Sequence, residues 1–102
     1  MSREVHDAKL VQVGYESLSV TSSAVKTLTA AKYAGATHAV IQTTENIRYM
    51  LDHAAGELAT DLGMKHTSSS PDLTIVTDFS LFGMIAESTT ATVEIMYCKV
   101  VA

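Results

Sequence analysis

The chain of 102 residues contains one cysteine, one proline and no tryptophan. Its single thiol, Cys98, excludes a disulfide within the chain and a zinc site built on several cysteines. Because Cys98 lies in an apolar run, we expect it to pack as a small core residue. The single proline, Pro71, belongs to the Ser-rich segment 68–72, which predicts a turn.

Charge is also scarce, since charged residues make up only 18% of the chain and the formal net charge is -4. The seven Lys and Arg residues are scattered, whereas a protein that binds a phosphate backbone needs them clustered, so nucleic acid is not an expected partner. No run approaches the roughly 18 apolar residues of a membrane span, and the polar first residues have no signal-peptide core. We therefore expect synthesis in the cytoplasm and no membrane partner.

Thr, Ser and Val are abundant, and they occur in short alternating segments. Branching at Cβ makes Thr and Val favour extended backbone. The pattern predicts strands at 10–20 (broken by a turn near 14–17), 25–28, 39–41, 73–75, 79–86 and 91–97, with a small-residue corner at 33–36. We therefore predict an all-β domain over 9–102, a small antiparallel β-sandwich or barrel of jelly-roll type, preceded by a flexible arm at 1–8.

The segment 46–63 fits two structures. Its apolar side chains fall on one helical face, and Thr44 and Gly63 are suitable caps. Gly56 costs a helix roughly 1 kcal/mol, and the alternation of Ile47 with Tyr49 is typical of a strand. Both interpretations stay open on periodicity alone.

Candidate chemistry is sparse. No two of the four histidines lie within ten residues of each other, so recognisable zinc spacing is absent. The serines have no nucleophile-elbow context, and the five glycines are too far apart to form a phosphate-binding loop. A carboxylate pair such as Glu57 and Asp61 is inevitable among eleven scattered acids. These features favour a protein that is not an enzyme and holds no metal or cofactor.

Four residues are candidates for an interface. Arg48 and Tyr49 lie in the tetrad Asn-Ile-Arg-Tyr, and both residue types are enriched at interfaces, although a buried Tyr beside an outward Arg is the simpler interpretation. Phe82 and Met84 lie in 79–86, which is apolar on both faces and is therefore either a central strand or pressed against a partner.

Several segments resemble small structural proteins encoded among the head genes of tailed bacteriophages. The matching residues lie at 28–31, 33–37, 39–41, 46–49 and 51–52, with weaker matches at 59–60, 63, 73–75 and 91–97. In that group Gly commonly follows the Leu-Asp pair, whereas this chain has His53. The resemblance implies a strand through Asp52, followed by at most one short helix around 54–62.

The resemblance also implies a role. It indicates a virion structural protein, most simply a capsid cement or decoration protein on the capsid surface that braces neighbouring subunits of the major capsid protein. Such a protein is expected to form homo-oligomers, as trimers or dimers. The alternatives are a head–tail connector or tail component and, in a different class, a carbohydrate-binding or adhesion module.

Overall fold

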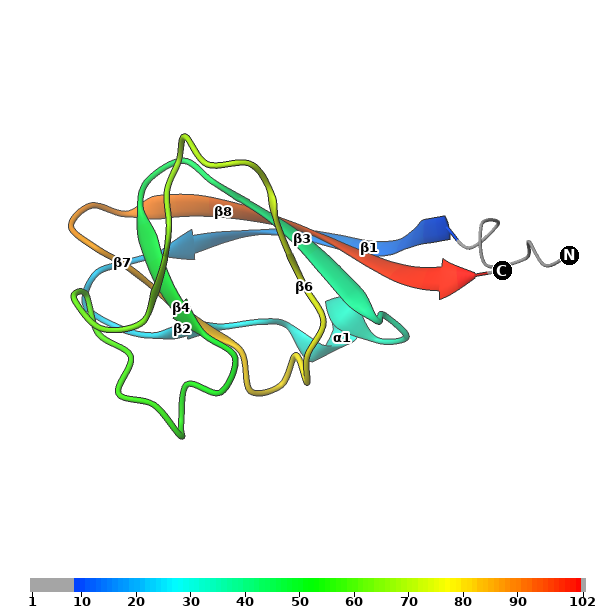
Figure 1. Cartoon of the computed structure of the whole chain (residues 1–102), viewed down its shortest axis with the longest axis horizontal. Helices are drawn as coiled ribbons and strands as arrows, with labels where there is room; N and C mark the ends of the chain where they lie inside the picture. Colours follow the sequence, from blue (N-terminus) through cyan, green and yellow to red (C-terminus); the bar gives the residue numbers. More distant parts are fainter. Residues whose placement is uncertain (1–8, 102) are drawn as a thin grey trace, which may run out of the picture.

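A computed structural model describes residues 9–101, which fold as two four-stranded antiparallel sheets packed against each other (Figure 1). Sheet A has the strand order β1 (Lys9–Val20), β8 (Ala91–Val101), β3 (His38–Thr43) and β6 (Leu73–Ile75). Sheet B has the order β2 (Lys26–Thr27), β7 (Gly83–Ala86), β4 (Ile47–Met50) and β5 (Met64–His66). The predicted arm at 1–8 lies outside the described residues.

The first four strands pair antiparallel with the last four, in reverse order along the chain. β1 pairs with β8, β2 with β7, β3 with β6, and β4 with β5, each pair antiparallel. Alternate pairs enter alternate sheets, which is the arrangement of a jelly roll. The predicted small antiparallel β-sandwich is therefore confirmed.

The core lies between the sheets and follows the alternation in the sequence. On β8 the side chains of Ala91, Val93, Ile95 and Tyr97 have no exposed surface, whereas those between them are exposed up to Met96. β7 is buried at every position because it lies between β2 and β4, so the apolar segment 79–86 contains a central strand. Cys98 is buried, as predicted.

The turn predicted near 14–17 is wrong, because β1 runs unbroken from Lys9 to Val20. The register with β8 shifts between Gln12 and Gly14, which marks a β-bulge. A Cβ on Gly14 would collide with the backbone oxygen of Lys32 in the short helix α1 (Ala30–Tyr33). Gly14 therefore lets the helix approach the strand closely rather than turning the chain.

The one short helix allowed by the sequence forms at a different place from 54–62. Within residues 9–101 the only helix is α1, which precedes the predicted corner, where Gly35 has φ +82°. Residues 51–63 form turns instead, shaped by the Asp52 carboxylate, which accepts hydrogen bonds from the backbone N–H groups of Ala54 and Ala55. The strand before them prevails because β4 pairs with both β5 and β7, contacts that a local periodicity does not report.

β1 and β8 extend beyond the rest of the sandwich as a two-stranded projection (Figure 1). β3 pairs with β8 only as far as the His38–Cys98 pair. Beyond it, Lys9–Val11 pair with Lys99–Val101, and β1 is the only described strand beside this end of β8. We call residues 9–13 and 98–101 the ribbon.

Candidate interaction surfaces

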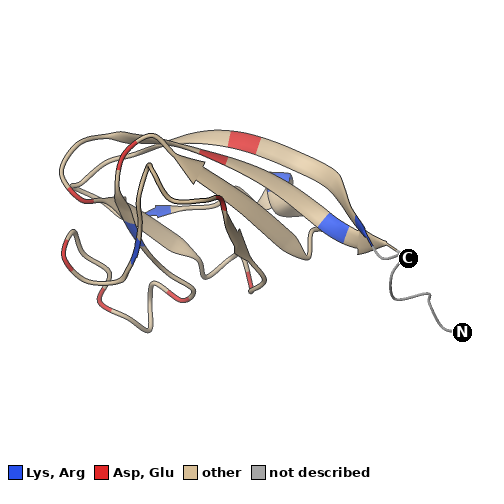
Figure 2. Ribbon diagram, turned by 45° about the horizontal axis from the view of Figure 1, so that its top comes forward, with Lys and Arg blue, Asp and Glu red and all other residues tan. Residues whose placement is uncertain are grey.

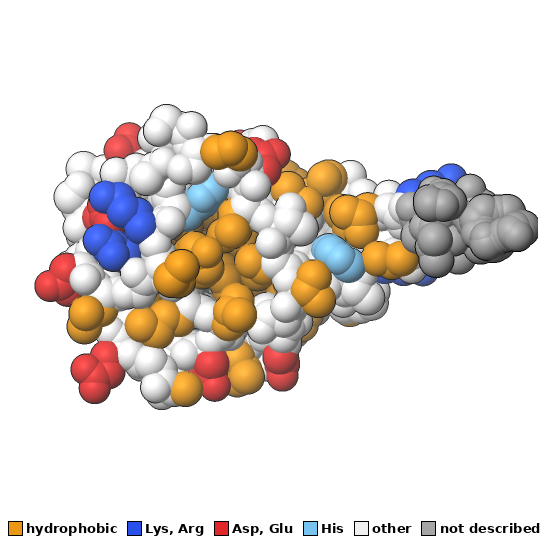
Figure 3. Space-filling view, viewed as in Figure 1, with side chains coloured by type: hydrophobic (Ala, Val, Ile, Leu, Met, Phe, Trp, Pro, Cys, Tyr) orange, Lys and Arg blue, Asp and Glu red, His pale blue; other side chains and the backbone are white. Residues whose placement is uncertain are grey.

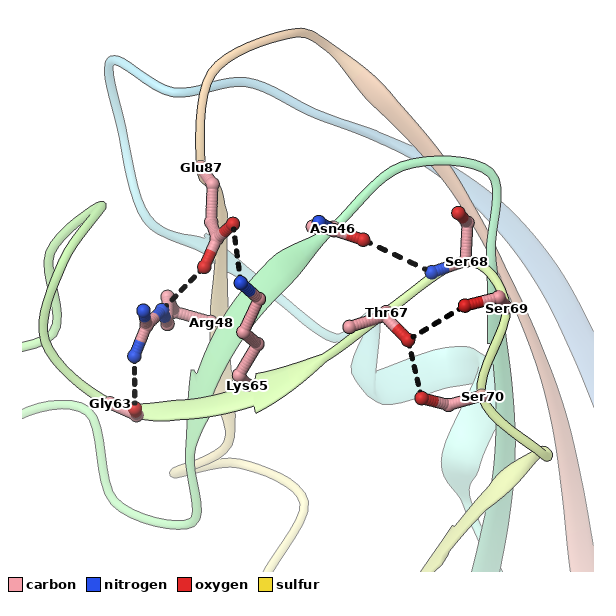
Figure 4. Close-up of polar contacts among 9 residues, drawn as sticks. All are labelled: Asn46, Arg48, Gly63, Lys65, Thr67, Ser68, Ser69, Ser70 and Glu87. Carbon is pink, nitrogen blue, oxygen red and sulfur yellow. Dashed lines mark hydrogen bonds and ion pairs between the residues drawn. The ribbon is translucent and has the colours of Figure 1, made fainter.

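Arg48 lies on the outer side of sheet B in a cluster of charged groups (Figure 4). Its Nε donates to Glu87 Oε2 over 2.7 Å, and its Nη1 donates to the backbone oxygen of Gly63 over 3.0 Å. Lys65 Nζ lies 3.5 Å from the other Glu87 oxygen. Three donors from this cluster thus hold β4, β5 and the segment after β7 together, so Arg48 is engaged within the molecule.

The Arg48 hydrogen bond lowers the pKa of Glu87 below its ordinary value of 4.5. Because the folded pKa lies below the unfolded one, the stabilisation is present above about pH 4.5 and is lost as the pH falls through the folded value. We expect wild type to melt at a higher temperature than Glu87→Gln at pH 7, with the gap closing toward pH 3. Thermal melts across this range measure it, with Glu57→Gln at an exposed position as control. A gap that is independent of pH would contradict the assignment.

Phe82 and Met84 are not surface residues. Both have no exposed area and belong to the core, so their prediction as interface residues is wrong. Tyr49 is half-buried and packs on Phe82, with the two ring centroids 5.7 Å apart. Within 79–86, residues 83–86 form a strand that is buried at every position, as expected of a central strand.

The outer side of sheet A carries a shallow hollow of about 220 Å³. At its centre, Tyr15 of β1 and Met96 of β8 are register partners and are 46% and 38% exposed. We call it the outer-face hollow, and it is lined by Gln12, Tyr15, Val40, Gln42, Asp72, Glu94 and Met96. The sequence contains an outward-facing Tyr and an outward-facing Met on two separate strands. Only the pairing of β1 with β8 shows that the two residues are neighbours.

Polar groups of the outer-face hollow satisfy one another. The Tyr15 hydroxyl donates to Glu94 Oε1 over 2.7 Å, which raises the pKa of Tyr15. Gln42 Nε2 donates to Asp72 Oδ2 over 3.2 Å. An apolar centre bordered by paired polar groups is the anatomy of a protein–protein contact.

A second apolar surface lies between the last strands of the two sheets, β5 and β6, in a groove of about 350 Å³. Leu51, Met64 and Val76 are 49%, 63% and 65% exposed there. Figure 3 shows hydrophobic side chains gathered around a hollow on this side of the molecule. We call it the edge groove, lined by Tyr49, Leu51, Met64, Leu73, Thr74, Ile75 and Val76.

Sequence reasoning missed one polar residue inside the protein, Glu16, which is only 7% exposed. Its Oε2 accepts hydrogen bonds from the Tyr97 hydroxyl over 2.6 Å and from the backbone N–H of Thr29 over 3.1 Å. Burial, followed by this hydrogen bond, raises the pKa of Tyr97 well above its usual value. In a continuous strand, Glu16 lies on the same face as Leu18 and Val20, so its side chain is directed toward the core. The turn predicted near 14–17 hid this pattern.

Residues 9–101 contain neither a grouped set of metal ligands nor a membrane-spanning helix. No three of the His, Cys, Asp and Glu side chains in this part of the chain come together as a metal site. No helix there is long and apolar enough to cross a membrane.

Comparison with known proteins finds no family model, curated protein or solved structure that matches the chain. The phage resemblance therefore stays a prediction.

Proposed function

We propose that the protein is a non-enzymatic structural component of a tailed-phage virion, a cement or decoration protein that binds outside the capsid shell. It braces neighbouring subunits of the major capsid protein. The phage resemblance motivates the proposal, and the outer-face hollow is the structural observation that carries it. Viral capsid domains also use jelly rolls, which supports the proposal by analogy of fold alone.

The outer-face hollow suits a rigid, repeated contact. Tyr15 offers a large contact area with few rotatable bonds, and Met96 adapts its shape to a partner. Both stand on paired strands, so little conformational entropy is lost when the surface is covered. Because a capsid repeats its subunits, a protein that contacts two neighbours at once gains affinity without stronger individual contacts.

Binding to purified empty capsids of the phage that encodes the chain tests the proposal. We expect wild type to saturate at one copy, or a simple fraction of one copy, per major capsid protein, measured by quantitative mass spectrometry. Met96→Asp should weaken binding at least about tenfold, because it buries a charge in the contact. Ser19→Asp, exposed on β1 outside the hollow, should bind like wild type.

Two results would contradict the proposal. Wild type that does not bind capsids would remove the cement role, and Met96→Asp that binds unchanged would remove the hollow from the contact. A handful of copies in each purified particle would instead indicate a head–tail connector or tail component.

A further inference from the structure

We propose that the ribbon of one copy docks into the edge groove of a second copy, so that the protein assembles head to tail. This contact goes beyond the proposed function, since it requires no capsid. It follows from three properties of the described residues: an uncovered ribbon, an uncovered groove and their opposite charges.

The ribbon exposes apolar surface, and outside its own strand pairing it is held mainly by hydrogen bonds of Thr37 to Cys98 and Val100. Leu10, Val11, Val13 and Val100 are each between 38% and 47% exposed. Leu10 and Val100 are register partners, so they form an apolar pair on one face. A two-stranded segment is only marginally stable in water unless it packs against another layer. The ribbon therefore gains stability from a partner that covers it.

The edge groove lies between two described strands that each lack a strand neighbour on one side. β6 ends sheet A and β5 ends sheet B, so each described strand has one edge without a strand neighbour. The groove between them is lined by exposed Leu51, Met64 and Val76. An extended strand laid along such an edge forms backbone hydrogen bonds and directs alternate side chains inward. β1, the edge strand of the ribbon, supplies such a strand with apolar side chains on both faces.

The opposite charges of the ribbon and of the edge groove favour a second copy of this chain as the molecule that binds in the groove. The ribbon, residues 9–13 and 98–101, carries Lys9 and Lys99 and no carboxylate. Figure 2 shows basic residues on the strands close to the C-terminus and most acidic residues farther away. Three carboxylates lie within two residues of the groove lining along the chain, namely Asp52, Asp72 and Asp78. Figure 3 shows acidic side chains around the apolar face. The cations nearest the groove, Arg48 and Lys65, already face Glu87. A cationic apolar ribbon and an acid-bordered apolar groove are complementary.

The geometry makes the contact heterologous. The ribbon points away from the body that contains the groove, so it reaches the groove of a neighbour rather than its own (Figure 1). Because two different surfaces meet, repetition of the contact generates a closed ring or an open chain.

Light scattering coupled to gel filtration of the full chain tests the contact, with two double variants. Leu10→Asp with Val11→Asp disables both faces of the ribbon, and Met64→Asp with Val76→Asp disables the groove. We expect wild type to be oligomeric and each variant to be monomeric, with the dissociation constant raised at least about 100-fold. An equimolar mixture should form dimers, because one intact ribbon and one intact groove remain.

Controls keep the test decisive. Val25→Asp, 37% exposed before the strand at the other edge of sheet B, should assemble like wild type. If the ribbon variant fails to fold by circular dichroism, Lys9→Glu with Lys99→Glu replaces it, and assembly should weaken roughly 2- to 30-fold.

Several results would overturn the inference. Wild type that stays monomeric up to about 1 mM would do so, because that concentration already reveals weak contacts. A groove variant that assembles normally, or a mixture of the two variants that stays monomeric, would show that ribbon and groove do not meet. None of these results bears on capsid binding through the outer-face hollow, so the two proposals fail separately.

Discussion

Glu16→Ala is expected to lower the free energy of unfolding by about 3 kcal/mol, with a fall in the melting temperature of more than about 10 °C. The carboxylate accepts hydrogen bonds from the Tyr97 hydroxyl on β8 and from the N–H of Thr29 just before α1. Alanine leaves the buried Tyr97 hydroxyl and the part-buried Thr29 N–H without their acceptor, and a desolvated donor costs more than the net value of the lost bond. Urea and thermal unfolding measure the change.

Matched variants separate the hydrogen bonds from the charge. Glu16→Gln keeps an acceptor oxygen, so it should cost less than Glu16→Ala. Tyr97→Phe removes only the hydroxyl donor, and its effect should be smaller in the Glu16→Ala background than in wild type. If the two changes are strictly additive, Glu16 and Tyr97 do not stabilise the fold as a pair.

Phe82→Ala is expected to cost about 3–5 kcal/mol of stability, since it removes a fully buried ring and leaves a cavity. The ring packs against Tyr49 of β4, so part of the loss is an aromatic contact within the core. Chemical denaturation measures the loss. Leu81→Ala, next to it in the chain but 39% exposed, should change stability by less than about 1 kcal/mol and serves as the control.

The same variant distinguishes a core residue from an interface residue. If Phe82 belongs to the core, Phe82→Ala protein that remains folded at low temperature should still self-associate and bind capsids. An interface role would give the reverse, with stability unchanged and binding lost.

The two proposals assign different surfaces to capsid binding and to self-association. The outer-face hollow lies on sheet A and is assigned to the shell, whereas the ribbon and the edge groove are assigned to neighbouring copies. A protein that braces a capsid from outside gains from both, because contacts between copies tie together shell subunits that each copy touches separately.

The sequence predicted those features that depend on the two faces of a single strand. Alternation from Ala91 to Tyr97 reports directly which side chains of β8 are buried, because successive side chains point to opposite faces. The turn at 68–72 is an equally local property. Cys98 directly follows buried Tyr97, so its burial does not follow from the alternation. The sum of such short strands was enough to predict a β-sandwich.

Tertiary structure alone decided which distant segments meet. The outer-face hollow exists because β1 pairs with β8, and Phe82, just before β7, is buried in the core, where it packs on Tyr49 of β4. The Arg48 cluster likewise joins residues from three separated segments. Where 46–63 satisfied a helical period, pairing of β4 with two distant strands prevailed. A periodic pattern specifies which face of an element is buried, but the partner that buries it is set by topology, through contacts between residues far apart in the chain.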